Sequence, residues 1–399
     1  MKKIISLFTG IVISIILIGC NTTKILEENT KENNRSSKYI FTERNIENIP
    51  NDNTLVPLFC NDNILYGKLL SNDGREINKA SIFSYSYNNG KFKKVEDGEF
   101  SEEETSFINN FNGDSGAGIY IVDSNKLSNR KFYFMDIKNG IKFELNDFEK
   151  TYSSIEFNLK KFINLGYKLD GNDDYFIYRY LSMENNEIGL VQEIIIIDIK
   201  NKKYYRFNNN DKIFIYFYYD NNEKSIMSID YEGKINKVIL EENSVIFEDY
   251  KELKLGDEKI YQKYGYYKPE LNANNLILRV ENNQSKEYLD YFNIMYNIKT
   301  NEIISLDKEK IILGSLNNTN LYIVLYENNR YLAEVSETGD INLIYKLDNE
   351  YKYMYLAPNE KGDNIFIARI KVSEENFKNY DKPMLKEEVK YSILEIEER

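Results

Sequence analysis

Residues 212–240 read KIFIYFYYDNNEKSIMSIDYEGKINKVIL, and this stretch sets the pattern for most of the chain. It contains an apolar, tyrosine-rich segment, a polar turn, a segment of alternating apolar and polar residues, a turn at Glu232-Gly233 and a further apolar segment. Aromatic and β-branched residues favour half-buried strands, and glycine supplies the positive φ that a tight hairpin turn requires. The stretch therefore predicts a meander of antiparallel strands.

Similar hairpins recur along the chain, and their spacing predicts the architecture. The turns fall at Gly90, Gly140, Asn201, Gly233, Asn301 and Gly339. On average they lie about 50 residues apart, the size of one four-stranded propeller blade. Residues 51–399 hold about seven such units. We expect an all-β fold, a β-propeller of seven blades within a range of six to eight. A β-sandwich or two β-domains built from the same hairpins is the alternative.

Closure of the ring follows from the burial of apolar surface. A four-stranded sheet that is apolar on both faces cannot cover them alone, whereas blades packed around a ring bury both faces. Residues 55–60, which read LVPLFC, form a short apolar segment ahead of the first hairpin. We expect them to add an extra strand to the C-terminal unit and so to close the ring.

Two loops resemble the TolB-type propeller signature, in which a Ser-Pro-Asp-Gly turn leads into an apolar strand. Residues 356–368 read LAPNEKGDNIFIA, and residues 268–278 read KPELNANNLIL. Ala357 stands in place of the serine and Asn359 in place of the aspartate. The resemblance implies a propeller and carries over no functional residue.

The first residues predict export and attachment to a membrane. Lys2 and Lys3 precede an apolar run over residues 4–19, which is typical of a secretory signal. The run ends in Leu-Ile-Gly-Cys20, which resembles the lipobox of bacterial lipoprotein precursors. The resemblance implies that Cys20 receives a diacylglyceryl group and becomes the first residue after cleavage. An uncleaved anchor, or a plain secretory signal, is the alternative.

These features divide the chain into three parts. Residues 1–19 are the expected signal peptide, and residues 20–53 a lipidated cysteine followed by a polar, asparagine-rich, disordered tether. Residues 54–399 are expected to form a single propeller domain. The expected location is the outer side of the cell membrane, held by the lipid, and acyl chains hold a protein there through buried methylene groups.

Composition excludes several classes of function. With 52 Lys and Arg against 64 Asp and Glu, the formal net charge is −12, which disfavours binding to nucleic acid. The chain has no histidine, so histidine-dependent triads and histidine-ligated metal sites are excluded. Of the two cysteines, Cys60 lies in an apolar segment and is expected to be a buried, inert thiol. No cofactor is expected.

No catalytic constellation emerges from the motifs. Ser115 lies in a Gly-Asp-Ser-Gly sequence but has no histidine base in this chain, so a loop is expected there. Residues 170–176 (DGNDDYF) begin like a calcium loop, but Tyr175 stands where an EF-hand needs glycine. A turn between strands is expected, with a weak calcium site of another type as the alternative.

Tyrosine clusters are the best candidates for binding. Tyrosine offers a flat apolar ring and a polar tip, which suits contacts with peptides or sugars. Dense groups occur in residues 216–220 (YFYYD) and 350–358, where strand propensity and packing between blades also explain them. The candidate ligand-binding residues are Tyr264, Tyr266 and Tyr267, because a glycine and a proline beside them predict a surface loop.

The combined interpretation is a lipid-anchored, extracytoplasmic binding protein that holds a protein or glycan partner on a propeller face. One alternative is an enzyme that works with carboxylates alone, such as a lyase or a glycosidase. Another is a structural or assembly factor of the bacterial cell envelope.

Overall fold

The computed structural model describes most of the chain after residue 37. The described residues are 38–46, 53–60, 64–71, 83–86, 91–94, 105–107, 117–122, 131–136, 139–159, 162–184, 187–209, 213–242, 244–255, 258–260, 270–272, 274–282, 291–316, 319–327, 329–347, 353–359, 361–372 and 386–399. In this part of the chain, no helix is both long and apolar enough to span a membrane.

The described residues form seven antiparallel sheets, which confirms the predicted seven-bladed β-propeller. We number the sheets as blades in chain order, beginning with the sheet that contains β2. Blade 1 consists of β2 (Asn53–Cys60), β3 (Ile64–Ser71), β4 (Phe83–Ser86) and β5 (Lys91–Lys94). Blade 2 consists of β6 (Thr105–Phe107), β7 (Ala117–Val122), β8 (Lys131–Asp136) and β9 (Ile141–Glu144). Blade 3 consists of β10 (Phe162–Lys168), β11 (Tyr175–Glu184), β12 (Glu187–Asp198) and β13 (Lys203–Asn209).

The remaining blades repeat this order with two variations. Blade 4 consists of β14 (Phe214–Asp220), β15 (Ser225–Asp230), β16 (Lys234–Leu240) and β17 (Val245–Glu252). In blade 5, β18 (Glu258–Ile260) and β19 (Glu270–Asn272) both pair with β20 (Asn275–Asn282), followed by β21 (Tyr291–Asn297) and β22 (Ile303–Ser305). Blade 6 consists of β23 (Ile311–Ser315), β24 (Leu321–Tyr326), β25 (Asn329–Val335) and β26 (Ile341–Lys346). Blade 7 joins both ends of the fold, with β27 (Tyr353–Pro358), β28 (Asn364–Val372), β29 (Lys386–Glu398) and β1 (Tyr39–Asn45).

The ring closes through β1, and the prediction that residues 55–60 close it is wrong. All seven residues of β1 pair antiparallel with β29, from Tyr39 opposite Glu398 to Asn45 opposite Ser392. Residues 55–60 instead belong to β2, the first strand of blade 1, which pairs with β3. The closing strand therefore lies within residues 20–53, which we expected to be a tether, because a strand at a sheet edge needs few apolar residues. Of its side chains only Tyr39 is buried, and Phe41 packs beside it.

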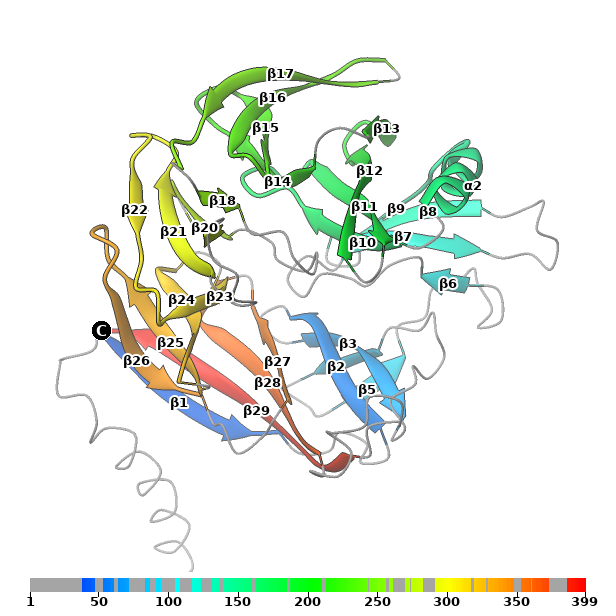
Figure 1. The fold of residues 1–399 in the computed structure, drawn as a ribbon. Helices are drawn as coiled ribbons and strands as arrows, with labels where there is room; N and C mark the ends of the chain where they lie inside the picture. Colours follow the sequence, from blue (N-terminus) through cyan, green and yellow to red (C-terminus); the bar gives the residue numbers. More distant parts are fainter. Residues whose placement is uncertain are drawn as a thin grey trace, which may run out of the picture.

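Apolar side chains join neighbouring blades, and Figure 1 shows the blades following one another around a ring. One large cluster runs through blades 3, 4 and 5. Smaller clusters join blades 2 and 3, blades 5 and 6, and blades 6 and 7. A further cluster joins blade 7 to blade 1, where Cys60 is buried as expected and its thiol donates to the carbonyl oxygen of Ala357 at 3.1 Å.

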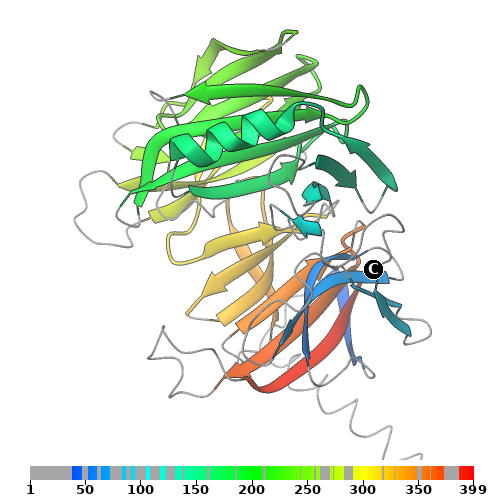
Figure 2. The same cartoon turned by 90° about the vertical axis from the view of Figure 1, so that its right-hand side faces the viewer.

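A helix that the sequence analysis did not predict lies between blades 2 and 3. Helix α2 (Phe148–Leu159) places Phe148, Tyr152 and Ile155 on its buried side, at a spacing typical of one helical face. The ring of Phe148 packs 5.2 Å from Phe132 of blade 2 and 5.1 Å from Tyr204 of blade 3. The helix lies on the outside of the ring, as the rotated view shows (Figure 2).

Candidate binding surface

Several residues singled out by the sequence lie outside the described part of the chain. They are Cys20, Ser115 and the three candidate binding residues Tyr264, Tyr266 and Tyr267. Their roles stay predictions. The residues of the YFYYD stretch are described, and Tyr216 and Tyr218 are fully buried between blades. Packing between blades therefore accounts for these two rings, which was the second explanation that the sequence offered for this cluster.

The calcium-like sequence forms a turn that joins β10 to β11 and touches blade 4. The backbone oxygen of Asp170 accepts a hydrogen bond from the amide of Tyr219 at 2.8 Å, and its carboxylate accepts one from the hydroxyl of Tyr216. Gly171 has a φ of +90°, and a Cβ there would come within 2.8 Å of the backbone oxygen of Tyr219. Among the described residues, no group of three His, Cys, Asp or Glu side chains could hold a metal ion. The turn therefore anchors blade 3 to blade 4.

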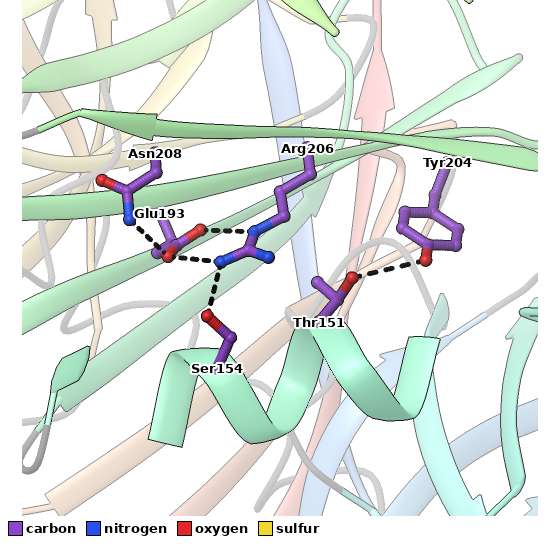
Figure 3. A network of polar contacts seen from close by, with 6 residues as sticks. All are labelled: Thr151, Ser154, Glu193, Tyr204, Arg206 and Asn208. Atoms are coloured by element: carbon purple, nitrogen blue, oxygen red, sulfur yellow. Dashed lines mark hydrogen bonds and ion pairs between the residues drawn. The ribbon is translucent and has the colours of Figure 1, made fainter. Parts of the chain in front are cut away.

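A polar network fastens α2 to the outer strands of blade 3 (Figure 3). The buried carboxylate of Glu193 accepts hydrogen bonds from Arg206 Nε at 2.9 Å and Nη2 at 2.8 Å, and from Asn208 at 2.7 Å. Arg206 Nη2 also donates to Ser154 of the helix at 2.9 Å. This geometry satisfies a charge that burial would otherwise destabilise. The network links the helix to β13 through Ser154 and Arg206 and through Thr151 and Tyr204, so we interpret it as structural.

An acidic or amide side chain recurs at the hairpin turn of three blades. Asp136 and Asp198 each accept hydrogen bonds from the backbone and side chain of the asparagine three residues later. Asn297 accepts from the amides of Lys299 and Thr300 in the same way. These turns read DIKN, DIKN and NIKT, a local repeat that signals a capped turn and no ligand site.

An exposed tyrosine identifies a different kind of surface between blades 4 and 5. Glu223, Tyr250, Lys251, Tyr296 and Asn301 meet there, and we call them the blade 4–5 cluster. The hydroxyl of Tyr250 donates to Glu223 Oε1 at 3.0 Å, and Lys251 Nζ donates to Asn301 Oδ1 at 2.6 Å. The hydroxyl of Tyr296 donates to the same amide oxygen at 2.9 Å.

The rings of this cluster flank the lysine. Lys251 Nζ lies 5.4 Å from the centre of the Tyr250 ring and 5.5 Å from that of Tyr296, within the range of cation–π attraction. Tyr296 is buried, whereas Tyr250 is 43% exposed. The register of β16 and β17 shifts at this point and leaves Tyr250 as an extra, unpaired residue of the ladder. A bulge of this kind redirects a side chain out of the regular sheet pattern.

Burial and nearby carboxylates shift the pKa values of the cluster. Burial raises the pKa of Tyr296 to about 12. The hydrogen bond to Glu223 is the main cause of a raised pKa at Tyr250. Burial lowers the pKa of Lys251, and the charges of Asp220 and Glu223 oppose this effect. At neutral pH the tyrosine hydroxyls therefore keep their protons and act as donors.

A second group of tyrosines lies on the other side of β14, toward blade 3. Tyr175 and Tyr205 are half-buried beside the buried carboxylate of Asp198, and the half-buried Tyr219 lies near Tyr175. Burial raises the pKa values of Tyr175 and Tyr205, and Asp198 raises both further.

Sequence reasoning missed Tyr250 because nothing around it forms a tyrosine cluster. It stands alone in the charged segment FEDYKE. Its partner Glu223 lies 27 residues away in the chain, and Asn301, which binds the adjacent Lys251, lies 50 residues from that lysine. The one available signal was a large aromatic residue amid charges on an expected outer strand.

Comparison with known proteins places the chain in the class of β-propellers. No protein-family model and no curated protein sequence matches it. Among solved structures, an oligogalacturonate lyase in complex with manganese is 10% identical with a TM-score of 0.50, and the match covers 90% of this chain and 98% of the lyase. An acylaminoacyl peptidase from Pyrococcus horikoshii is 9% identical with a TM-score of 0.46, covering 85% of this chain and 52% of the peptidase.

A third neighbour is the WD40 domain of Neurospora crassa Pan2, 6% identical with a TM-score of 0.42, covering 86% of this chain and 89% of that domain. Identities this low establish the fold alone. A propeller fold by itself assigns no activity, because one fold hosts many unrelated functions.

Proposed function

We propose that this protein is a lipid-anchored, extracytoplasmic binding protein that holds a protein or glycan partner on the propeller, with the blade 4–5 cluster as a contact site. The supporting observation is the exposed ring of Tyr250, fixed at its hydroxyl by Glu223 and flanked by Lys251. A rigid aromatic residue beside charged donors and acceptors is the usual anchor of a recognition surface.

The state of the carboxylates favours binding over acid–base catalysis. Asp220 accepts from the amides of Asn222 and Glu223, which fixes the turn after β14. Glu223 accepts a hydrogen bond from the hydroxyl of Tyr250. Carboxylates committed to such bonds orient neighbouring groups, whereas a general acid or base needs a free path to the substrate.

The lipid anchor is tested by metabolic labelling. Cells that express the full chain are grown with an alkyne analogue of palmitate, and labelled protein is detected after purification. We expect label on the wild type and on Cys60→Ser, whose thiol is buried, and none on Cys20→Ser. Equal label on Cys20→Ser and the wild type would contradict the anchor.

The contact site is tested by placing a photoreactive phenylalanine analogue at position 250 of the full chain in the producing cells. Position 326, on β24 of blade 6, serves as the matched control because Tyr326 is partly exposed and lies outside the cluster. We expect a crosslinked product from position 250 and none from position 326. A protein adduct indicates a protein partner, and a carbohydrate-positive adduct indicates a glycan.

The identity of a crosslinked protein distinguishes the proposed binding function from the alternative of an envelope-assembly factor. Crosslinks confined to envelope-assembly machinery would replace the binding function by that of an assembly factor. Equal yields from the two positions, or none from either, would contradict the blade 4–5 cluster as a contact site.

A further inference from the structure

We propose that β17 is a docking edge that takes a basic, extended segment of a partner protein as an added strand of blade 4. This inference rests on the proposed binding function and deepens it by naming the chemistry of the partner. It commits to a peptide segment, so a glycan ligand is an outcome that would overturn it.

The position of β17 in its sheet is the first observation. Within the described residues, β17 pairs with β16 alone, so its other edge carries backbone donors and acceptors that no strand takes up. An extended peptide can bond to such an edge through its main chain. The strand also forms the outer limit of its blade, as the upper part of Figure 1 shows.

The charge of the strand is the second observation. Residues 241–252, EENSVIFEDYKE, carry five carboxylates and one lysine. That lysine, Lys251, is turned onto Asn301 between two tyrosine rings. Glu248 lies opposite Lys237 in the ladder, yet no ion pair forms between these two described residues. The whole chain is acidic as well, which draws basic partners over a distance.

Exposed apolar side chains on the strand are the third observation. The described residues include four exposed large hydrophobic side chains, and two of them, Ile246 and Tyr250, lie on β17 at 39% and 43% exposure. Phe247, between them, anchors the strand by stacking on Phe214 at 4.0 Å. The edge is thus held firmly while it presents both apolar and acidic groups outward.

Protection of the sheet edge against aggregation is another possible role for these carboxylates, but it does not explain all three observations. Edge strands are often protected by charged residues, lysine above all. The carboxylates of β17 serve that purpose against acidic or neutral strands, but two exposed apolar side chains work against it. An edge that exposes both carboxylates and apolar side chains instead complements a strand of basic and apolar residues.

The test measures binding of two acetylated hexapeptides to the purified chain by fluorescence anisotropy. One alternates lysine and valine, and the other alternates glutamate and valine. We expect the lysine peptide to bind at least about tenfold more tightly, and its affinity to fall as salt rises from about 50 to 200 mM. A lysine peptide with N-methylated backbone amides should lose most of its binding, because it cannot donate to the strand edge.

Variants locate the contact. Glu248→Lys should weaken binding of the lysine peptide about tenfold or more, and Glu248→Gln should weaken it less. Glu144→Lys, on the outermost strand of blade 2, is the matched control and should leave the affinity unchanged. Equal binding of both peptides, an active N-methylated peptide or a normal affinity in Glu248→Lys would overturn the docking edge.

These outcomes are distinguishable from failure of the proposed function. A carbohydrate adduct from position 250, together with no peptide binding, would keep the binding function and reject the basic peptide. An absent adduct together with tight lysine-peptide binding would keep the edge and move the contact away from Tyr250.

Discussion

Tyr216 and Tyr218 lie two residues apart on β14, and both are fully buried. The hydroxyl of Tyr216 donates to the carboxylate of Asp170, which pins the turn of blade 3 to blade 4. The hydroxyl of Tyr218 has no hydrogen-bond partner among the described residues. Burial raises the pKa of Tyr218 far above its usual value. One ring therefore contributes a polar contact, and the other carries an unsatisfied group.

This contrast predicts opposite effects of the same substitution. Removing an unpaired buried hydroxyl relieves its desolvation cost, so Tyr218→Phe should raise the free energy of unfolding by about 1 kcal/mol. Tyr216→Phe should lower it by about 2 kcal/mol, because a hydrogen bond to a carboxylate is lost. Urea unfolding followed by circular dichroism measures both. Equal destabilisation by the two substitutions would contradict the assigned contacts.

At the scale of elements, one side chain of β1 makes polar contacts with three other strands. Glu43 accepts hydrogen bonds from Arg369 of β28 and Ser392 of β29, each at 2.5 Å, and from Tyr345 of blade 6 at 3.1 Å. The other guanidinium nitrogens of Arg369, Nε and Nη2, have no partner among the described residues. Glu43 therefore neutralises a buried charge while it joins the first strand of the chain to blades 6 and 7.

Removing that carboxylate should loosen ring closure. We expect Glu43→Ala to lower the free energy of unfolding by about 3 kcal/mol, because Arg369 is left buried without its charge partner. The neighbouring Arg44→Ala is the matched control. It breaks an exposed ion pair to Glu395 and should cost less than about 1 kcal/mol. Urea unfolding gives the free energy of unfolding of both variants. Similar losses in the two variants would contradict the role of the Glu43–Arg369 contact in ring closure.

The elements most easily predicted from the sequence are those whose contacts are local. The hairpins of blade 4 are marked by alternating residues and by Gly233, whose φ is +86°. The closing strand and α2 could not be predicted in the same way. β1 buries only Tyr39, and its partners are remote in the sequence: β29 pairs along its whole length, and Arg369 lies 326 residues from Glu43. Helix α2 contains β-favouring phenylalanine and tyrosine and is held by blade 3, so tertiary packing overrides local propensity.

At the scale of the whole molecule, arginines on the second strands of blades 3 and 5 connect these blades to the blades that follow them. Arg179 of blade 3 donates to the backbone oxygen of Ile215 in blade 4, and Arg279 of blade 5 donates to that of Ile312 in blade 6 at 3.1 Å. Arg369 lies on β28, the second strand of blade 7. It donates to Glu43 of the closing strand and not to the next blade. The same kind of contact thus joins blade 3 to blade 4 and blade 5 to blade 6, and in blade 7 the arginine holds the strand that closes the ring.

Buried tyrosines in several blades predict that the free energy of unfolding falls at high pH. Burial raises the pKa values of Tyr296 and Tyr391 to about 12, whereas unfolded tyrosine titrates near about 10. Between these values the unfolded chain loses protons that the folded chain keeps, so the free energy of unfolding should fall as pH rises from about 10 to 12. Below about pH 10 these tyrosines stay protonated in both states, so their contribution to the free energy of unfolding should not change with pH.

Urea midpoints measured from about pH 8.5 to 11.5 check this expectation. Tyr296→Phe removes one of the groups and should flatten the decline, although it also loses the bond to Asn301. A midpoint that stays constant over this range would show that these tyrosines are not buried as described.

The sequence indicated the architecture better than the candidate surface, for a physical reason. A repeat of about 50 residues survives as turns and strand rhythm because every blade must bury the same two faces. The blade 4–5 cluster obeys no such rule. It combines a turn of blade 4, the bulge at Tyr250 and a turn of blade 5, and only the packing of two blades brings them together.

The pairing of β1 with β29 also constrains when this protein can fold. Glu43 and Ser392 are 349 positions apart, so the ribosome makes one long before the other. Blades 1 to 6 are each encoded by a continuous stretch and can assemble during synthesis, but blade 7 must wait for the final strand. A prematurely terminated chain would keep β28 with an uncovered edge, and such an edge pairs readily with other chains. Nonsense variants that end shortly before β29 should accordingly yield insoluble protein.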